Sequence, residues 1–357
     1  QLLVRWFSNK DVLNFYNDEN DPNWGLESFS HNSTVNSSSH NPTRRFAVFA
    51  CSIHSSTLAY IFYAPLIVAA WRRVGYEVIV IFVGDFHLPE ATSPRFNITR
   101  RFLRRMGAIV LKIQSNVSYA TKISQLIRVF VGLLPTAVVK DEDGLITTDA
   151  DLIPINSGQY EFDPRSDGFL INPLCCGNFQ RRGSIYRMLP MSHVYLKKRT
   201  WRAILIQSKQ RAELLFLNGS RELLSNNAQF SFQTINLYAH HEFSDIYDQN
   251  MVKGDSAWYM DQMLLSMLLT DYRGNHPSLV IAQRNLTERL DRDSGISYWN
   301  RSSFDQFGDA HLPHDEIFTP HYWEILNKLL RFLFTDTQVN IFNRYYYTYK
   351  LSGKKNY

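Results

Sequence analysis

The feature that most constrains the fold is the alternation of short apolar runs with longer segments of helical apolar spacing between residues 44 and 148. The apolar runs are nearly uninterrupted, as in strands that are buried on both faces. Strands that alternate with helices in this way form parallel sheets. We therefore predict an α/β fold with a mostly parallel central sheet flanked by helices. The predicted strands are 45–51, 77–83, 108–113 and 144–148, and the predicted helices are 58–73, 99–106 and 119–133.

The most informative motif is Asp149-Ala150-Asp151, which directly follows the fourth predicted strand. Ligands of open α/β sheets bind at the carboxyl ends of the strands. Two carboxylates placed there favour a hard divalent cation, Mn²⁺ or Mg²⁺, which also binds phosphate oxygens. The chain has neither a G-x-G-x-x-G turn after its first strand nor a G-x-x-x-x-G-K-[ST] loop, so a phosphate must be held in another way. These observations favour a metal-diphosphate site over a solvated acidic turn.

Residues 44 to about 325 resemble a GT-A-fold glycosyltransferase. The resemblance is carried by the Asp-x-Asp motif and by segment 122–128, which is similar to a helix that precedes the motif in family-8-like members. It implies that Asp149 and Asp151 bind the metal and that Arg128 and Lys122 contact the nucleotide-sugar. The other donor-binding residues implied by the resemblance are Ser52, Ile53, His54, Asp85 and Ala150.

Asp261-Gln262 lies near the start of a predicted helix over 258–269 and resembles the acidic motif that faces the acceptor in GT-A enzymes. In an inverting enzyme such an acid is the general base, and in a retaining enzyme it lies beside the reactive face of the sugar. Helix capping is the alternative interpretation. Segment 188–196 resembles the strand beside the donor sugar. His193 in this segment either contacts the donor or acceptor or is a structural histidine.

The segment 309–315 carries two histidines among acidic residues. Pro313 separates them, which does not suit a helical zinc site. GT-A enzymes commonly supply a third metal ligand, often a histidine, from late in the domain. The resemblance therefore implies His311 or His314 as that ligand, with His314 slightly favoured. An exposed polar loop is the alternative.

Composition sets residues 1–43 apart as a polar, low-complexity stem or linker. The resemblance implies a glycosyltransferase domain over 44–330, on which we expect a C-terminal helix and tail over 331–357 to pack. The segment 321–334 has the apolar spacing of a packing helix, although its basic residues leave a helix on a membrane surface open. The aromatic tail over 344–349 either flanks an acceptor groove or packs as a late strand.

Seven N-x-S/T sequons predict an N-glycosylated protein of the secretory pathway lumen, in the Golgi. A membrane anchor would have preceded this sequence. The three cysteines permit one disulfide from Cys51 to Cys175 or Cys176, or buried free thiols. The net charge of +5 comes without a long basic run, which argues against nucleic-acid binding. The sequons begin at Asn32, Asn36, Asn97, Asn116, Asn218, Asn285 and Asn300.

These features together predict a metal-dependent hexosyl- or pentosyltransferase. Its donor would be a nucleotide-diphosphate sugar, UDP-linked, and its acceptor a hydroxyl of a glycan or glycoprotein. One alternative is a non-catalytic secreted carbohydrate-binding protein on a GT-A scaffold. Another is a metal-dependent nucleotidyltransferase or phosphodiesterase that uses the same aspartates, although residues 52–56 lack the Gly-rich basic loop that is usual in nucleotidyltransferases.

Overall fold

The computed structural model describes residues 43–163, 165–206, 230–285 and 288–352. Residues 1–42 of the predicted stem and the sequons at Asn32, Asn36 and Asn218 lie outside these residues. The strands are β1 (Arg45–Ser52), β2 (Glu77–Gly84), β3 (Ile109–Gln114), β4 (Gly144–Thr147), β5 (Leu152–Pro154), β6 (Gly168–Ile171), β7 (Asn178–Arg181), β8 (Ser184–Arg187), β9 (Val194–Lys197), β10 (Ile281–Arg284), β11 (Arg289–Asp291) and β12 (Asp309–His311).

The α-helices are α2 (Ala59–Arg73), α3 (Pro94–Arg105), α4 (Val117–Leu126), α5 (Lys198–Ile206), α7 (Phe232–Glu242), α8 (Met260–Asn275), α9 (Ile296–Trp299), α10 (Pro320–Leu333) and α11 (Asp336–Leu351). Short 3-10 helices connect them. These are η2 (Pro89–Thr92), η3 (Ile127–Leu133), η4 (Ser157–Tyr160), η5 (Ser256–Tyr259), η6 (Arg292–Ser294) and η7 (Asp315–Phe318).

Within the described residues, seven strands form a central sheet in the order β10-β6-β9-β4-β1-β2-β3. Strand β9 is antiparallel to both of its neighbours, and the other neighbouring pairs are parallel. The register pairs Val48 with Thr147 and Ser52 with Val83, so β1, β2 and β4 end at the same edge of the sheet. The predicted α/β fold with a mostly parallel central sheet is therefore confirmed, and the architecture is consistent with a GT-A-like fold.

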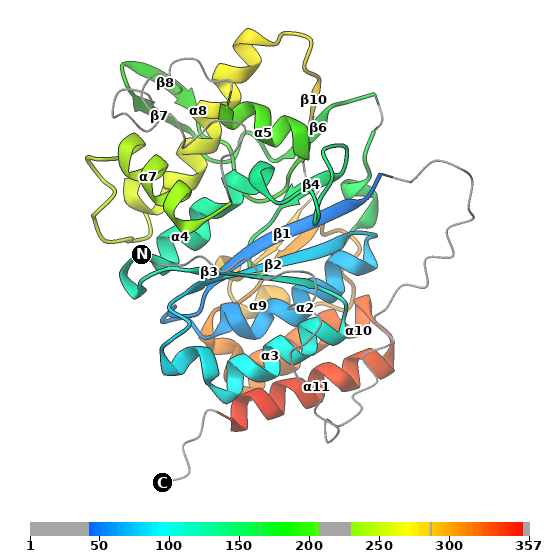
Figure 1. The fold of residues 1–357 in the computed structure, drawn as a ribbon. Helices are drawn as coiled ribbons and strands as arrows, with labels where there is room; N and C mark the ends of the chain where they lie inside the picture. The colour runs from blue at the N-terminus through cyan, green and yellow to red at the C-terminus, as the bar shows by residue number, and fades with distance from the viewer. Residues whose placement is uncertain (1–42, 164, 207–229, 286–287, 353–357) are drawn as a thin grey trace.

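Helices cover both faces of this sheet, as Figure 1 shows. The α2, α3, α10 and α11 helices lie on one face, and α4, α5, α7 and α8 lie on the other. Strand β1 contributes side chains to the core on both faces of the sheet. Ala47 and Phe49 pack on the side of α2, and Phe46 and Val48 pack on the side of α4. This double burial explains why its sequence is apolar throughout instead of alternating.

Helices α3 and α4 differ at their ends from the predicted ranges. Helix α3 begins at Pro94 and not at residue 99, because the Ser93 side chain accepts a hydrogen bond from the Phe96 N–H and Pro94 suits the first helical position. The predicted helix over 119–133 is an α-helix as far as Leu126 and continues as the 3-10 helix η3. The change of helix type places Arg128 in η3.

The aromatic tail forms a helix, so the prediction of a late strand over 344–349 was wrong. Thr335 and Gln338 make a reciprocal capping box at the start of α11. Tyr345 then contacts both neighbouring helices, donating its hydroxyl to the Phe62 carbonyl (3.0 Å) and lying 2.9 Å from the Thr99 hydroxyl. These contacts fix α11 against α2 and α3.

The predicted strand over 188–196 was also mostly wrong, because β9 begins only at Val194. The preceding residue, His193, has a left-handed backbone with φ of 61°, which is not a strand conformation, so the strand begins only after it. No helix in the described parts of the chain is long and apolar enough to cross a membrane.

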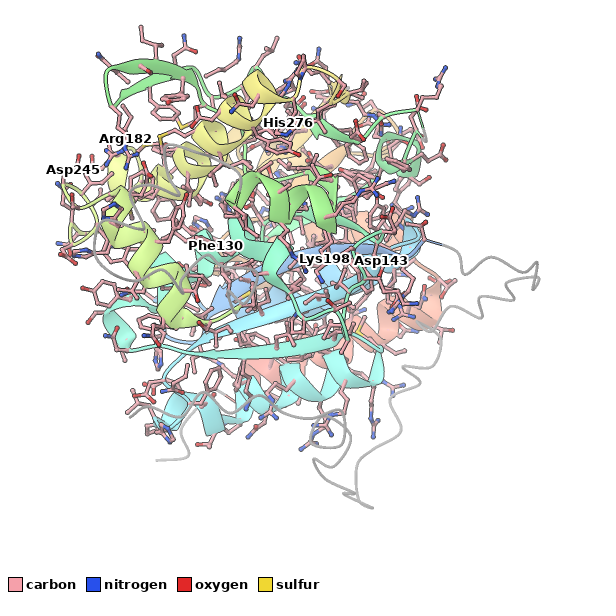
Figure 2. All side chains as sticks on the ribbon, turned by 45° about the horizontal axis from the view of Figure 1, so that its top comes forward. Phe130, Asp143, Arg182, Lys198, Asp245 and His276 are labelled. Carbon is pink, nitrogen blue, oxygen red and sulfur yellow. A yellow bond between two sulfur atoms is a disulfide. The ribbon has the colours of Figure 1, made fainter. Side chains whose placement is uncertain are left out.

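Ion pairs tie the β7–β8 hairpin to the last residue of α7 and to the turn that follows it, at one corner of the molecule (Figure 2). Arg181 lies 2.7 Å from Asp245, and Arg182 lies 3.2 Å from Glu242. These contacts hold the segment after β6 against the layer that also contains α8.

Candidate active site

The ends of β1 and β2 bring the first predicted donor-binding residues together. The Ile53 N–H donates to the Val83 carbonyl (2.9 Å), and the Asp85 N–H donates to His54 Nε2 (2.9 Å). Gly84 is needed for this approach, because a Cβ there would lie 2.3 Å from Ile53 Cγ1 and 2.8 Å from the His54 ring. Ser52, at the end of β1, is buried and accepts from the His54 N–H (3.1 Å).

Arg128 joins two of the other predicted residues. Its guanidinium pairs with Asp149 and, at 2.7 Å, with Asp261, and it also donates to the Thr148 carbonyl (3.2 Å). The Asp261 side chain is 3% exposed and the Asp149 side chain is 31% exposed. The structure therefore connects the end of β4, helix η3 and the first turn of α8 through one buried arginine.

Burial and charge oppose each other in this group. Burial alone would lower the pKa of Arg128, but Asp149 and Asp261 outweigh it and raise the pKa. Burial raises the pKa of Asp261 more than Arg128 lowers it. A buried carboxylate of this kind is stabilised only while its partner stays in place.

A second cluster surrounds Asp151. The antiparallel pairing of β12 with β5 places His311 opposite Leu152, and the Asp151 carbonyl accepts from the Leu312 N–H (2.8 Å). His311 Nε2 lies 3.5 Å from Asp151 Oδ2, and its Nδ1 lies 3.4 Å from Asp291 Oδ2. Arg292 also pairs with Asp151. Of the two predicted histidines, His311 is the one that contacts the Asp-x-Asp motif.

In this cluster the electrostatics favour a charged carboxylate at Asp151 and a protonated imidazole at His311. Burial would raise the pKa of Asp151, but His311 and Arg292 outweigh it and hold the pKa well below its usual range. Burial would lower the pKa of His311, yet Asp151 and Asp291 raise it to about 9. His311 is therefore protonated at neutral pH as long as no metal ion is bound beside Asp151.

This raised pKa predicts a loss of stability at high pH in metal-free buffer. Below about pH 6.5 His311 is protonated in both the folded and the unfolded chain, so its pairs with Asp151 and Asp291 contribute fully. Between pH 6.5 and about 9 the unfolded chain has lost this proton and the folded chain still holds it, so we expect the unfolding free energy to fall by about 3 kcal/mol over this range. Urea unfolding at several pH values should show this slope in the wild type and a weaker slope in His311→Gln. Equal slopes would contradict the assignment.

His314 lies on the other side of the same loop. Its Nε2 is 3.4 Å from the Tyr60 hydroxyl, and burial followed by the charge of Arg292 lowers its pKa. The next residue, Asp315, accepts hydrogen bonds from the Leu58 N–H (3.2 Å) and the Ala59 N–H (2.8 Å). Asp315 therefore caps the start of α2 from a distant part of the chain and fixes the loop that carries both histidines.

Replacing Asp315 by alanine should cost about 1 kcal/mol, because two N–H groups at the start of α2 lose their acceptor. We expect a decrease of about 2 °C in the unfolding midpoint, measured by circular dichroism. Glu316→Ala is the matched control, since Glu316 is the neighbouring acid and is exposed. Equal effects of the two substitutions would show that the capping contact is not the cause.

Three predicted residues lie elsewhere or make other contacts. His193 is fully buried against Trp71 and Tyr160, and burial lowers its pKa to about 4, which supports the structural interpretation. Lys122 donates to the backbone carbonyls of residues 247 and 249 and does not turn toward the aspartates. Ala150 is buried between the two aspartates and packs in the core.

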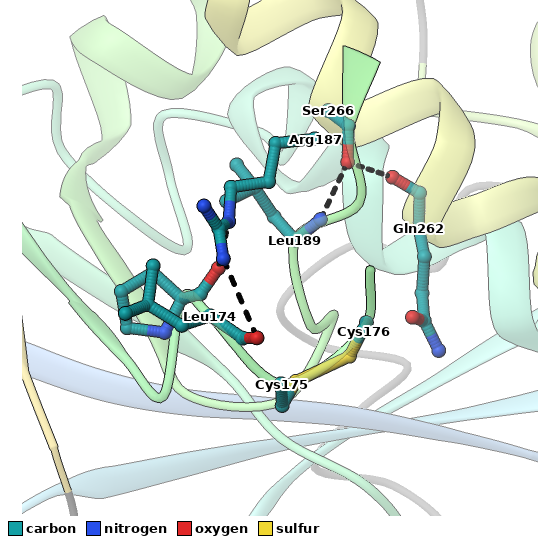
Figure 3. Close-up of a disulfide and its surroundings, with 8 residues drawn as sticks. Leu174, Cys175, Cys176, Arg187, Leu189, Gln262 and Ser266 are labelled. Carbon is teal, nitrogen blue, oxygen red and sulfur yellow. Dashed lines mark hydrogen bonds between the residues drawn. A yellow bond between two sulfur atoms is a disulfide. The ribbon is translucent and has the colours of Figure 1, made fainter. Parts of the chain in front are cut away.

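Gln262 follows Asp261 and is held by backbone contacts. Its N–H donates to Asp261 Oδ1 (2.8 Å), and its carbonyl accepts from the Ser266 hydroxyl (2.6 Å). That hydroxyl accepts in turn from the Leu189 N–H (2.8 Å), which ties α8 to the loop before β9 (Figure 3). The Gln262 Oε1 atom is buried and has no hydrogen-bond partner among the described residues.

The disulfide joins Cys175 to Cys176, so the alternative in which Cys51 pairs with one of them was wrong (Figure 3). Cys51 is a buried free thiol at the end of β1, and burial raises its pKa. Its partners in the prediction lie in the loop after β6, on another part of the sheet edge. Adjacent cysteines need only a local loop conformation to pair, and cysteine counting does not detect that.

The structure adds Arg292 and Asp291 to the site, neither of which the sequence interpretation included. Both come from the end of β11 and the start of η6. The Arg289-to-Asp293 segment alternates acidic and basic residues around one leucine, and this was the available signal. Arg289 holds the buried Asp309 with two hydrogen bonds of 2.8 and 2.7 Å, which fixes β11 beside β12.

The donor types of the site fit a divalent cation. Asp149 and Asp151 offer carboxylate oxygens, and His311 offers an imidazole nitrogen next to Asp151. Within the parts of the chain that the structure describes, no three His, Cys, Asp or Glu side chains converge on one point. Metal binding by all three residues therefore requires Asp149 to turn away from Arg128 and His311 to lose its proton.

No protein-family model matches the chain. No curated protein matches it in sequence either. Among solved structures the chain is similar to one described as 4-diphosphocytidyl-2C-methyl-D-erythritol synthase, with a TM-score of 0.29 and 11% sequence identity. That similarity covers 47% of this chain and 80% of the other. A TM-score of 0.29 is too low to assign a fold or a function.

Proposed function

We propose that the protein is a metal-dependent glycosyltransferase that moves a sugar from a nucleotide-diphosphate donor, a UDP-sugar, to a hydroxyl of a glycan or glycoprotein. The observation that carries the proposal is the contact network at the carboxyl ends of the parallel strands. Arg128 joins Asp149 to Asp261, and His311 adjoins Asp151. Independent sequence segments supply these residues, and each was predicted for the same site.

In this proposal Asp149, Asp151 and His311 hold Mn²⁺ or Mg²⁺. A bound divalent cation supplies charge that stabilises the departing diphosphate. Arg128 is placed to add positive charge beside Asp149, and it can donate to phosphate oxygens once Asp149 turns away. Arg292 adds a second guanidinium beside Asp151. The chain thereby provides two fixed cationic groups where the leaving group gains negative charge.

The Asp261 side chain is almost completely buried and is paired with Arg128. This burial supports a role in orienting Arg128 on the donor side of the site. A general base must come within hydrogen-bond reach of the acceptor hydroxyl, and the buried side chain reaches it only if neighbouring groups move. We therefore assign Asp261 as a positioning residue in the proposed reaction.

The proposal is tested by measuring UDP release from UDP-sugars in the presence of Mn²⁺, with and without a chelator. We expect slow hydrolysis of at least one UDP-sugar that stops when the metal is removed. CTP or UTP with a sugar phosphate forms the comparison arm. Pyrophosphate release in that arm, without turnover of any UDP-sugar, would favour a nucleotidyltransferase. No turnover and no UDP binding would favour the carbohydrate-binding alternative.

We also propose that the protein resides in the lumen of the secretory pathway, in the Golgi. Of the sequons within the described residues, Asn116, Asn285 and Asn300 are exposed. Asn97 donates its side-chain amide to the Thr92 carbonyl (2.9 Å). We expect peptide N-glycosidase to reduce the mass of protein made in eukaryotic cells. An unchanged mass would contradict this location.

A further inference from the structure

A groove separate from the candidate active site runs between α10 and α11, which lie side by side in Figure 1. The groove is open to solvent, and its volume of about 650 Å³ lies in the range of sites for small organic ligands. Its lining comes from these two helices alone and is both aromatic and polar. The residues that the inference uses are Trp323, Asn327, Lys328, Asn343, Tyr347 and Lys350.

The floor of the groove combines aromatic edges with amides. Trp323 and Tyr346 stack on each other with centroids 4.1 Å apart and are nearly buried, so each covers one face of the other. The Trp323 Nε1–H donates to Asn343 Oδ1 (3.0 Å), which also accepts from Asn327. The buried Asn327 Oδ1 has no hydrogen-bond partner among the described residues. That oxygen has almost no accessible surface, so the amide that this floor offers to a ligand hydroxyl is the partly exposed one of Asn343.

The walls of the groove are mostly cationic. Lys328, Arg331 and Lys350 line it together with one acid, Glu324. Arg331 pairs with Asp336 at 3.1 Å, but both side chains are more than half exposed, so this pair is weak. Lys328 contacts the amide oxygen of Asn300, and Lys350 lies 5.6 Å from the centroid of the Tyr346 ring. Neither lysine has a carboxylate partner in the described part of the chain, so the acidic groups of an anionic ligand can form ion pairs with both.

The shape of the groove distinguishes between classes of anionic ligand. Stacking of successive nucleic-acid bases needs several open ring faces. Trp323 and Tyr346 cover one another, and this leaves Tyr347, 58% exposed, as the open ring of the groove. A membrane surface needs an extended exposed apolar face, whereas the large exposed apolar side chains of α10 and α11 are limited, in the described residues, to Phe332, Tyr347 and Leu351. Paired amides, one open aromatic ring and flanking cations suit sugar rings that carry acidic groups.

We propose that the groove between α10 and α11 binds an anionic oligosaccharide. The accessible floor amide contacts a hydroxyl group, Tyr347 packs against a sugar ring, and Lys328 and Lys350 pair with carboxylate or sulfate groups. The ligand class follows from these side chains and does not rest on the proposed transferase activity. The groove gives the protein a second carbohydrate site, distinct from the one at the strand ends.

The test is calorimetric titration with a chondroitin sulfate hexasaccharide, without metal or nucleotide-sugar, so that it is independent of transferase activity. We expect saturable binding by the wild type and about tenfold weaker binding by Lys328→Ala, Lys350→Ala and Tyr347→Ala. Arg344→Ala is the matched control, because Arg344 is an exposed cation of α11 outside the groove. This variant should bind like the wild type.

Three comparison ligands complete the experiment. Neutral cellohexaose, a single-stranded oligonucleotide and phosphatidylserine vesicles should each bind more weakly than the sulfated hexasaccharide. Equal binding of the oligonucleotide or the vesicles would overturn the proposal in favour of that ligand. No saturable binding of the hexasaccharide, or an equal loss in Arg344→Ala, would also overturn it.

Discussion

Replacing Arg128 by methionine is expected to lower the free energy of unfolding by about 3–5 kcal/mol, because the substitution leaves a buried carboxylate without its partner. The Asp261 side chain is 3% exposed and lies 2.7 Å from the Arg128 guanidinium. Methionine fills similar space but offers no positive charge and no donor. The measurement is urea unfolding followed by circular dichroism at pH 7.

The controls for this prediction separate buried charge from lost packing. Arg331→Met removes an arginine–aspartate pair whose side chains are 56% and 88% exposed, and it should leave the unfolding midpoint nearly unchanged. Adding Asp261→Asn to Arg128→Met should restore part of the lost stability, since no buried charge then remains at position 261. If Arg128→Met alone were as stable as the wild type, Arg128 and Asp261 would not be paired in solution.

The effect of Arg128→Met should also depend on pH. Burial raises the pKa of Asp261 in the folded chain, and removing Arg128 removes a charge that opposes this rise. A carboxyl group with a raised folded-state pKa destabilises the fold as the pH increases from its unfolded value through its folded value. The deficit of the variant should therefore be larger at pH 8 than at pH 5. A deficit that is smaller at pH 8 would contradict burial as its cause.

Asp151→Ala is expected to reduce metal-dependent UDP release by about a thousandfold, equivalent to about 4 kcal/mol of transition-state stabilisation. Asp151 contacts both His311 and Arg292, so the substitution removes a proposed metal ligand and releases the second. Turnover should be compared at a temperature where circular dichroism shows both proteins folded.

The matched control for Asp151→Ala is Asp293→Ala. Asp293 belongs to the neighbouring segment η6, but its side chain is 70% exposed and lies 3.4 Å from Lys253. Its removal should leave turnover within about twofold of the wild type. If Asp151→Ala kept full metal-dependent turnover, the proposed metal site would have to lie elsewhere.

The parallel sheet could be predicted because its strands are buried on both faces and therefore carry continuous apolar runs. Asp149 and Asp151 could be placed at the sheet edge for the same reason, since the apolar run stops directly before them. The resemblance to GT-A enzymes implied that Arg128 and Asp261 both belong to the site. Their contact across 133 positions could not be inferred from the sequence, because it depends on how η3 and α8 pack.

The starts of two helices, the role of Arg292 and the disulfide differ from what the broader sequence pattern predicted. The capping residue Ser93 and the capping box at Thr335 are local sequence signals that mark where α3 and α11 begin. The alternating charges around Arg292 do not identify its partner, because its contact with Asp151 arises when β11 pairs with β12 beside β5. The adjacent disulfide likewise reflects one loop conformation.

The central claim, that Asp151 and His311 hold a divalent cation that binds a nucleoside diphosphate, is tested most directly by electron paramagnetic resonance titration of Mn²⁺ in the presence of UDP. The proposed site predicts one bound Mn²⁺ per wild-type chain. It also predicts binding at least tenfold weaker in Asp151→Ala and in His311→Ala, with Asp293→Ala unchanged. Mn²⁺ binding of equal strength in all four proteins, or none in the wild type, would contradict the claim.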